Sequence, residues 1–268
     1  MIELNINRCG GFFIGGNMEI NKIYNEDCLE GMKKIPDGSI DFVCTDLPFG
    51  ITNCEWDKKI DLQKFWEQVN RITKLNAAIT LFASGKFLIE LGSSNLKNYR
   101  YEWVWEKPNG TNFFSVKKVP LNVHENILVF YKKFPTYNPQ YRKGKAYFRE
   151  HKNYRGGVFS AQKRVNNPTD NDGEHYYPRN VIKFPAVYGG KTERFHNSQK
   201  PVELIEYLIK TYTNEGETVL DATIGSGTTA VAAINTGRNF IGFELDENYF
   251  DVANERIEKV LNEKSIIV

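Results

Sequence analysis

The stretch of sequence that decides the fold is Asp221-Ala222-Thr223-Ile224-Gly225-Ser226-Gly227-Thr228-Thr229-Ala230. It joins a predicted strand, residues 218–221, to a predicted helix over residues 228–235. Gly225 and Gly227 let the backbone approach a ligand, and the first turn of the helix points its free N–H groups towards that ligand. The stretch therefore predicts an α/β protein with a ligand at a strand-to-helix junction.

An acidic residue at a set distance makes this motif more specific. Glu244 lies nineteen residues after Gly225, at the end of the next predicted strand, residues 239–243, where a carboxylate can accept both hydroxyls of a ribose. Glycines alone also serve the steric needs of a tight turn. The strand, the loop, the helix and the spaced acid together are typical of a nucleoside-cofactor site.

The class of cofactor stays open at this point, because the stretch also fits the G-x-G-x-x-A pattern of dinucleotide-dependent oxidoreductases. Only 24 residues follow Glu244, which is too few for the remaining strands of such a domain, so the N-terminal half must supply them. Predicted strands over residues 40–45, 77–83, 101–105 and 126–131 accompany predicted helices over residues 61–74, 201–212 and 249–262. This alternation indicates a mostly parallel sheet covered on both faces.

The composition predicts a globular protein without a membrane span. Hydrophobic residues make up 41% of the 268 residues and charged residues 25%, and no apolar segment reaches the roughly 18 residues of a transmembrane helix. The N-terminus lacks the pattern of a secretory signal. The four cysteines, Cys9, Cys28, Cys44 and Cys54, do not have zinc-site spacing, so we expect no metal site and reduced thiols in a cytoplasmic protein.

The positive charge is concentrated between Lys132 and Lys200. That segment has fifteen Lys or Arg against five Asp or Glu, a net charge of +10 that leaves −8 for the rest of the chain. It also contains seven tyrosines and five phenylalanines, without a sustained helical or strand period. Cations for phosphates and rings for bases are typical of a nucleic-acid surface. A solvated loop region with locally packed tyrosines is the alternative.

A second motif, Asp46-Leu47-Pro48-Phe49, directly follows the apolar segment 40–45. It lies at the carboxyl edge where open α/β sheets bind ligands. An acid, a rigid proline and an exposed aromatic ring suggest a clamp for a flat polar group. The ring would stack on that group, while the acid and a nearby carbonyl accept hydrogen bonds from an amino group. A plain turn explains the same residues in isolation.

The order of these motifs is similar to that of the amino-methylating DNA methyltransferases of the β type, in which the catalytic region comes first. That family has a D-P-P-Y-like motif near the N-terminus, then a target-recognition region, then H-P-T-Q-K-P, and finally D-P-F-x-G-S-G-T-T. The resemblance covers nearly the whole chain from Ile20 onward, including an upstream acidic loop at residues 25–29 and 39–41. In the family's order, this chain has Asp46 to Phe49, the basic segment, His196-Asn197-Ser198-Gln199-Lys200-Pro201, and Asp221 to Thr229.

The resemblance implies the Rossmann-like fold of S-adenosylmethionine-dependent methyltransferases. The expected sheet is mostly parallel and seven-stranded, with a circularly permuted motif order and a basic recognition insert. Residues 18–131 would form the catalytic half, residues 132–195 the target-recognition insert and residues 196–268 the cofactor-binding half. Residues 1–17, rich in Gly and Asn, are predicted to be a leader that either is disordered or precedes a true start at Met18.

The resemblance also implies S-adenosyl-L-methionine as the methyl donor. Glu244 would bind its ribose, and Asp27 with Cys28 would contact the adenine edge. The methionine part would be held by Lys200, Ser198 and the glycine loop, although the residues alone also allow Lys200 to be a surface cation beside a helix. The loop residues assigned to the cofactor are Asp221, Thr223, Gly225, Gly227, Thr228 and Thr229.

For catalysis, the resemblance implies that the target base is flipped out of the duplex, because its exocyclic amine cannot meet the sulfonium inside the stack. Phe49 would stack on the base, in a turn that Pro48 keeps rigid. Asp46 and the main-chain carbonyl of Leu47 would accept the two amino hydrogens, which frees the nitrogen lone pair for attack on the methyl group. Alignment and electrostatics would supply most of the rate gain without a covalent intermediate, so the cysteines are expected to be packing residues.

The chain departs from the family pattern at Leu47 and Asn197, which replace prolines, and at Thr223, which replaces phenylalanine. Because the first change loosens the turn, a catalytically weak DNA-binding relative is one alternative. Asp46 favours adenine N6, since Ser at this position accompanies cytosine N4, which stays the alternative target. Relatives with an N-P-P-Y motif that modify RNA or protein glutamine usually place the cofactor loop first, opposite to the order here. The expected partner is double-stranded DNA, and the family suggests a homodimer and a cognate restriction endonuclease.

Overall fold

The structure is a computed structural model that describes residues 5–6, 12–14, 18–50, 58–143, 175–187, 194–195 and 199–266. The chain divides into a large unit, residues 1–138 and 180–268, and a small unit, residues 139–179. In the small unit, strands β9 (Arg142–Lys143) and β10 (His175–Tyr176) form an antiparallel pair. All other elements belong to the large unit.

The large unit is built on an eight-stranded sheet with the strand order β11-β7-β8-β6-β5-β12-β13-β4. Neighbouring strands are parallel except around β8, which runs antiparallel to both β6 and β7. In chain order the strands are β4 (Lys22–Asn25), β5 (Ile40–Thr45), β6 (Thr73–Ala83), β7 (Tyr99–Thr111), β8 (Asn122–Phe130), β11 (Val181–Lys183), β12 (Thr218–Asp221) and β13 (Asn239–Glu244).

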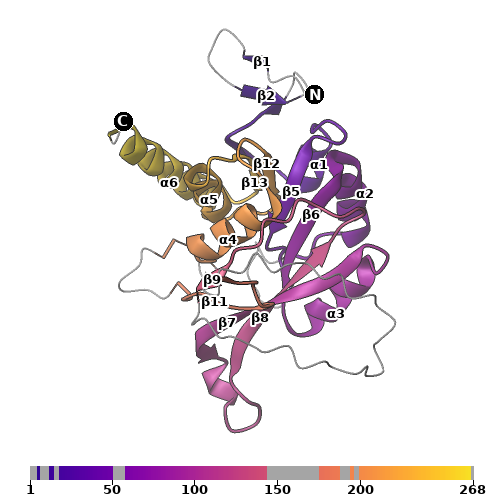
Figure 1. The fold of residues 1–268 in the computed structure, drawn as a ribbon, viewed down its shortest axis with the longest axis vertical. Coiled ribbons are helices and arrows are strands. Elements are labelled where there is room, and N and C mark those ends of the chain that lie inside the picture. The colour runs from indigo at the N-terminus through magenta and orange to yellow at the C-terminus, as the bar shows by residue number, and fades with distance from the viewer. Residues whose placement is uncertain are drawn as a thin grey trace, which may run out of the picture. The chain divides into compact units, whose positions relative to one another are not determined.

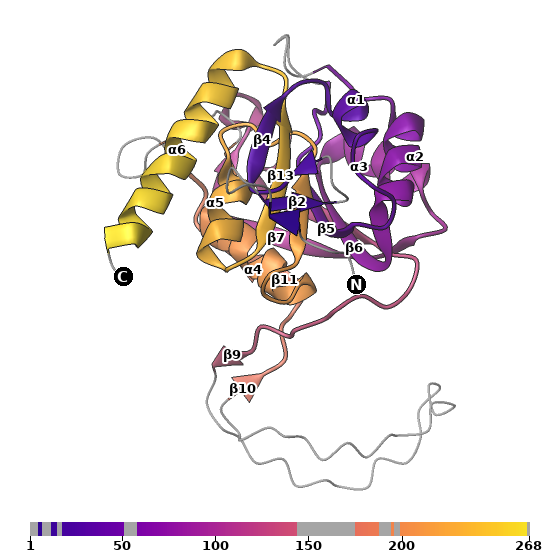
Figure 2. The ribbon, with the colours of Figure 1, turned by 90° about the horizontal axis from the view of Figure 1, so that it is seen from above.

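Helices cover both faces of the sheet (Figures 1 and 2). Helices α1 (Cys28–Met32), α2 (Leu62–Ile72) and α3 (Gly85–Ser94) pack on one face. Helices α4 (Val202–Tyr212), α5 (Thr228–Asn235) and α6 (Glu247–Ile266) pack on the other. The spacing of the apolar residues explains this arrangement: in α2, Phe65, Val69 and Ile72 recur on one side, and all three are fully buried. Two hydrophobic cores result, one on each face.

The direction in which successive strands are added changes between β5 and β12. These two strands are parallel neighbours, with Val219 opposite Phe42, but the chain proceeds outward from them in opposite directions. Open α/β sheets bind ligands at such a switch point, beside the carboxyl ends of the strands. Asp46 directly follows β5 and Asp221 ends β12. The fold therefore brings the two sequence motifs to one place.

The predicted fold class is confirmed, with differences in detail. The sheet has eight strands where seven were expected, because β11 pairs with β7. A three-residue strand within the basic segment carries too little pattern to be recognised from sequence. The helix predicted over residues 61–74 ends at Ile72, and β6 begins at the next residue. Helix α3 and the long extension of β7 and β8 were not predicted.

Parts of the predicted leader and insert form strands. Strands β1 (Asn5–Ile6), β2 (Phe12–Ile14) and β3 (Met18–Glu19) make a small antiparallel sheet in which Ile14 is buried. The rest of residues 1–17 and most of the insert, including residues 144–174, lie outside the described residues, so the domain limits stay predictions. In the part of the chain that the structure describes, no helix is both long and apolar enough to cross a bilayer.

Candidate functional site

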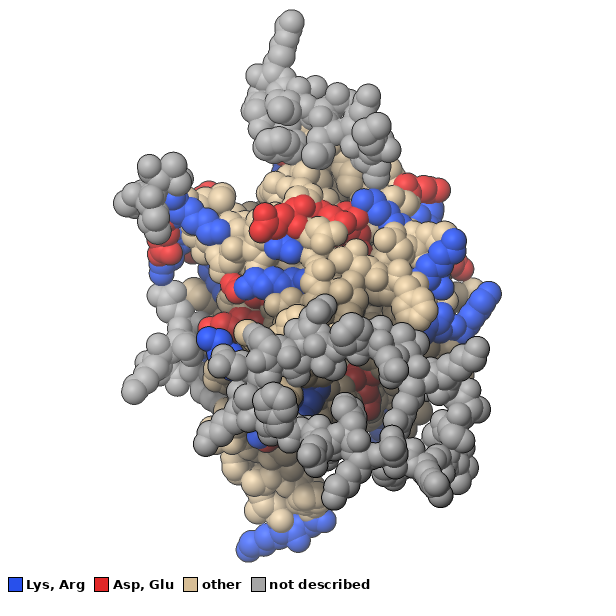
Figure 3. Space-filling model, in the orientation of Figure 1, with Lys and Arg blue, Asp and Glu red and all other residues tan. Residues whose placement is uncertain are grey.

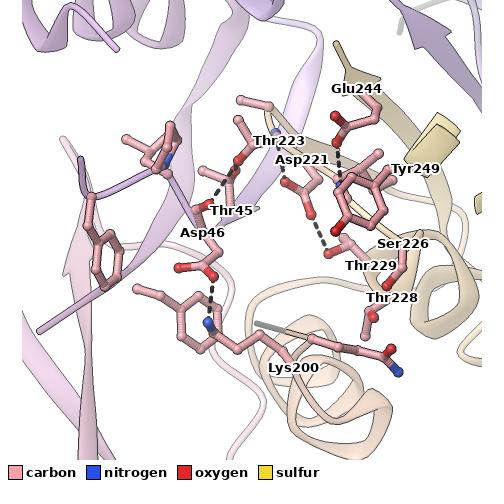
Figure 4. A pocket seen from close by; sticks show the side chains of 18 of the residues that line it. Thr45, Asp46, Lys200, Asp221, Thr223, Ser226, Thr228, Thr229, Glu244 and Tyr249 are labelled. Atoms are coloured by element: carbon pink, nitrogen blue, oxygen red, sulfur yellow. Dashed lines mark hydrogen bonds and ion pairs between the residues drawn. The ribbon is translucent and has the colours of Figure 1, made fainter. Parts of the chain in front are cut away.

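A pocket of about 1010 Å³ lies at the carboxyl ends of β5, β12 and β13 and at the N-terminus of α5. Thirteen of the fifteen predicted site residues line it (Figure 4). Of the other two, Gly227 packs against Ala253 of α6, and Ser198 lies outside the described residues, together with His196 and Asn197. The lining residues are Asp27, Cys28, Asp46, Leu47, Pro48, Phe49, Lys200, Asp221, Thr223, Gly225, Thr228, Thr229 and Glu244.

The glycine loop has a backbone shape that only glycine adopts readily. Gly225 and Gly227 have φ values of 53° and 80°, in the left-handed region. A Cβ atom on Gly227 would lie only 3.0 Å from the Cβ atom of Ala253 in α6, so the glycine also permits close helix packing. On the outer side of the loop, Arg256 donates hydrogen bonds to the carbonyl and, at 3.1 Å, to the hydroxyl of Ser226. Arg256 in α6 thus fixes the side of the loop that carries Ser226.

Two acids hold the loop from the strand side. Glu244 accepts hydrogen bonds from the backbone N–H of Gly225 at 2.8 Å and of Asp246 at 2.9 Å. Asp221 accepts one from the N–H of Thr223 at 3.1 Å and one from the Thr229 hydroxyl at 2.6 Å. Burial raises the pKa of both carboxyls, that of Asp221 to about 6. Both acids therefore shape the loop, and both line the pocket.

Asp46 belongs to a buried network of four charges. Its Oδ2 atom accepts a hydrogen bond from Lys200 Nζ at 2.5 Å (Figure 4). The same ammonium lies 3.1 Å from Glu125 Oε1, and Glu125 Oε2 lies 2.8 Å from Lys107 Nζ. The side chains of Lys200, Glu125 and Lys107 are 11%, 8% and 18% exposed, and that of Asp46 is 24% exposed. Two carboxylates and two ammonium groups thus compensate one another at the pocket wall.

The network determines which of these groups carry charge. Burial opposes the charge of Lys200, but the adjacent carboxylates of Asp46 and Glu125 raise its pKa, so it stays cationic. Burial likewise opposes ionisation of Glu125, but Lys200 and Lys107 together lower its pKa. The pKa of Asp46 is raised, mainly by burial and further by the Glu125 charge, against the opposing effect of Lys200.

The other oxygen of Asp46 is buried and has no hydrogen-bond partner among the described residues. A buried, unpaired carboxylate oxygen costs free energy, roughly 1–3 kcal/mol or more for a charged group. Lys200 holds Oδ2 and so restricts rotation of the carboxylate, and Asp46 is one of the residues that line the pocket. This arrangement suits an oxygen that accepts a hydrogen bond from a ligand.

A chain of hydroxyls joins the glycine loop to the Asp46 backbone (Figure 4). The Thr223 hydroxyl donates a hydrogen bond to the Asp46 carbonyl at 3.0 Å, and it lies 3.0 Å from the Thr45 hydroxyl. Position 223 departs from the family pattern, and here the threonine connects the two motifs directly.

The remaining residues of the Asp46–Phe49 motif are anchored by apolar contacts. Leu47, at the other departure from the family pattern, is 1% exposed and packs into the core beside α1 to α3. Phe49 is half-buried, and its ring stacks on Phe87 with centroids 4.8 Å apart and planes inclined by 26°. The buried leucine side chain anchors the turn that a proline would otherwise stiffen, and one face of the Phe49 ring is already in contact.

Asp27 and Cys28 line the pocket from the start of α1. Asp27 Oδ1 caps this helix, accepting hydrogen bonds from the N–H groups of Leu29 and Glu30 at 2.8 and 3.2 Å. Cys28 is 6% exposed, and burial raises the pKa of its thiol to about 12, so it is not a thiolate nucleophile. Cys44 is also a buried free thiol. Across the described residues, no three His, Cys, Asp or Glu side chains form a cluster that could hold a metal ion.

The family model for N6/N4 DNA methylases matches residues 40–255, which include both motifs and the strands that carry them. The chain belongs to this DNA methylase family. Curated relatives are the Type II methyltransferases M.HpaI of Haemophilus parainfluenzae and M.BglII of Bacillus subtilis. They are 27% and 29% identical to this DNA methylase over 88% and 87% of its length, and 74% and 68% of their own.

Solved structures support the fold of this DNA methylase. The M1.HpyAVI complex with S-adenosylmethionine has a TM-score of 0.59 at 24% identity and covers 88% of this chain and 98% of its own. The cytosine-N4-specific PvuII DNA methyltransferase has a TM-score of 0.63 at 17% identity and covers 90% of this chain and 91% of its own. The predicted family and fold class are therefore confirmed.

Sequence reasoning missed several residues of the site in this DNA methylase. Thr45 immediately precedes Asp46, and Glu125 immediately precedes the apolar segment 126–131. An acid at the start of a buried strand needs a partner, so Glu125 carried a usable signal. Lys107 and Arg256 carried none, because each contacts residues far away in the sequence.

Proposed function

We propose that this DNA methylase transfers a methyl group from S-adenosyl-L-methionine to the exocyclic N6 of adenine in a specific DNA sequence, after the base has been flipped out of the duplex. The observation that carries the proposal is the Asp46 carboxylate. One oxygen is held by Lys200, the other is buried and unpaired, and the residue lines the pocket that the glycine loop also lines. The site thus has an acceptor for an amino group beside a loop typical of nucleoside cofactors.

The methyl donor is S-adenosyl-L-methionine, which supplies an electrophilic methyl group on a sulfonium. The pocket fits it: the left-handed glycines leave room above the loop, and the Glu244 carboxylate lines the space where it would accept hydrogen bonds from the ribose hydroxyls. We assign the ribose to Glu244, the adenine edge to Asp27 and Cys28, and the methionine part to the loop at Gly225 and the first turn of α5. The volume of about 1010 Å³ is at the upper end of the range for small-molecule sites, in keeping with a pocket that takes a base as well as the cofactor.

In this mechanism Asp46 is the catalytic residue and Lys200 positions it. Asp46 Oδ1 accepts a hydrogen bond from the amino group, which makes the nitrogen lone pair available, and it takes up the proton that the nitrogen loses after methylation. Lys200 stays cationic, so it holds Oδ2 and favours the ionised form of the carboxylate against the effect of burial. This contact differs from the sequence prediction, which placed Lys200 at the methionine part of the cofactor. Thr223 holds the Asp46 carbonyl from the loop side.

The proposed target base rests on the residue at the first position of the Asp46–Phe49 motif. Asp46 favours adenine N6 by its resemblance to the family pattern, whereas the fold alone does not separate the two targets, since a cytosine-N4 enzyme shares it. N4 of cytosine therefore stays the alternative. We further propose that the basic segment of residues 132–200 contacts DNA, on the basis of its net charge of +10.

The test is methyl transfer from labelled S-adenosylmethionine to mixed-sequence duplex DNA, followed by digestion to nucleosides and mass spectrometry. N6-methyladenine is the expected product, and N4-methylcytosine would overturn the base assignment only. Asp46→Ala should abolish transfer but retain cofactor binding. Asp251→Ala, an exposed aspartate on α6 outside the pocket, is the matched control and should retain full activity. Full activity of Asp46→Ala would refute the proposal.

A further inference from the structure

Beyond the sheet, β7 and β8 continue as a hairpin whose outer part, residues 107–123, we call the outer hairpin. Thr111 pairs with Asn122, and a short 3₁₀ turn, η2 (Phe113–Ser115), forms the tip. Asn112 connects the two sides: its side chain accepts a hydrogen bond from Asn122 N–H at 2.8 Å and donates one to the Pro120 carbonyl at 3.3 Å. The tip therefore has a defined shape.

The outer hairpin presents an unusual surface. Phe113 is 62% exposed and Phe114 is fully exposed, and Val116 and Val119 are each 47% exposed. Lys117 and Lys118 are exposed beside them, and the sequence from Lys107 to His124 contains no acidic residue. Figure 3 shows basic side chains at the end of this hairpin, at the bottom of the view, with tan surface above them and no red. A cluster of exposed apolar side chains is typical of an interaction surface, and the adjacent cations indicate a partner with negative charge.

The outer hairpin starts at the wall of the catalytic pocket. Trp105, Lys107 and Thr111, all on or at the end of β7, line that pocket. If one unit of a polymer enters the pocket, the neighbouring units of that polymer therefore lie beside the outer hairpin. Duplex DNA is anionic along its whole length, and an extruded base leaves a gap in the stack that an apolar side chain can fill.

We infer that the outer hairpin is a second DNA-contacting element, distinct from the basic segment of residues 132–200. Lys117 and Lys118 contact backbone phosphates, and Phe113 and Phe114 press against the bases next to the extruded one. This inference rests on the proposed function, since it takes the substrate to be duplex DNA.

The lysine contribution is tested by DNA binding in the full chain. The dissociation constant for a mixed-sequence duplex is measured at several salt concentrations with the wild type and with Lys117→Ala/Lys118→Ala. Each lost phosphate contact reduces the slope of log K against log salt by about 0.9, so we expect a decrease of about 2 and roughly tenfold weaker binding at low salt. The matched control is Leu96→Ala/Lys97→Ala, an exposed apolar and cationic pair elsewhere on the large unit, which should leave the slope unchanged.

The aromatic contribution is tested by catalysis. Phe113→Ala/Phe114→Ala should lower kcat/KM for DNA at least fivefold, leave the S-adenosylmethionine dissociation constant within about twofold, and leave the salt slope unchanged, because uncharged rings displace no counterions. Unchanged DNA binding by the lysine variant together with unchanged kcat/KM in the phenylalanine variant would overturn the inference. The inference would also be overturned if the variants bound DNA like the wild type but lost self-association in sedimentation experiments. That result would assign the surface to a second copy of the chain.

The two proposals fail in different ways. If the wild type shows no methyl transfer but the lysine variant loses DNA affinity, the proposed function is wrong and the outer hairpin still binds DNA. If Asp46→Ala abolishes transfer while the hairpin variants behave as wild type, only the hairpin inference is wrong.

Discussion

Replacing Glu125 by glutamine should move the acid limb of the pH profile of methyl transfer to lower pH. Asp46 must be ionised to accept the amino hydrogen, so the pH at which activity falls on the acid side reports the pKa of Asp46. That pKa is raised by burial and by the Glu125 charge. Removing this negative neighbour lowers it, and the carboxylate then stays ionised at lower pH.

The structure sets the size of the shift. Asp46 Oδ2 and Glu125 Oε1 contact the same Lys200 Nζ atom, at 2.5 and 3.1 Å. The two oxygens therefore lie within about 6 Å of each other, where repulsion between unit charges is about 3 kcal/mol at an effective dielectric constant of about 20. That energy corresponds to about two pH units, and Lys107, which partly neutralises Glu125, reduces the expected shift to about one unit.

The assay is kcat/KM for DNA, measured at saturating S-adenosylmethionine from about pH 5 to about pH 9. Saturation with cofactor keeps the titration of Asp221 and Glu244, whose pKa values are also raised, out of the profile. Thermal unfolding of each variant shows whether the fold is retained.

A second variant should shift the acid limb of the pH profile in the opposite direction. Lys107→Met removes a cation that lowers the pKa of Asp46, so the acid limb should move to higher pH. If both variants fold but their acid limbs coincide with that of the wild type, or move in the same direction, the charges of Glu125 and Lys107 do not act on Asp46 and the reasoning is refuted.

Two further predictions follow from the loop contacts. Thr223→Val leaves the Asp46 carbonyl without its hydrogen-bond donor, so the free energy of unfolding, measured by calorimetry, should fall by roughly 1–2 kcal/mol. Turnover, measured by steady-state kinetics, should fall about tenfold, and cofactor affinity should stay within about twofold of the wild type. A large loss of cofactor affinity with unchanged turnover would contradict the positioning role. Asp221 has a folded-state pKa of about 6, above the ordinary 3.8, so it binds more protons in the folded state and its contribution to stability falls as pH rises from about 4 to about 6. Asp221→Asn should flatten this part of the profile of unfolding midpoint against pH, and an unchanged slope would exclude Asp221 as its source.

The sequence by itself determined the local chemistry of this protein. The glycine loop, with the acid nineteen residues later, predicted a strand-loop-helix cofactor site, because these features depend on backbone shape and spacing within one short segment. The structure places Gly225, Thr228 and Glu244 at one pocket, as this pattern requires. The order of the motifs also predicted the family, which the match to residues 40–255 confirms.

Only the tertiary structure decided which side chains meet across the sheet. Lys200 and Asp46 are 154 residues apart, and nothing in their local sequence predicts that one neutralises the other. Glu125 joins them because β8 and β5 both flank β6, an arrangement set by packing of the two cores.

The outer hairpin was likewise decided only by the tertiary structure. Residues 107–123 show turn residues and scattered apolar positions, a pattern that fits any exposed loop. Strand pairing between β7 and β8 turns it into an ordered projection beside the pocket. Local patterns report the preferences of single segments, whereas a shared pocket depends on contacts between segments that are far apart in the chain and that form only when the sheet is assembled.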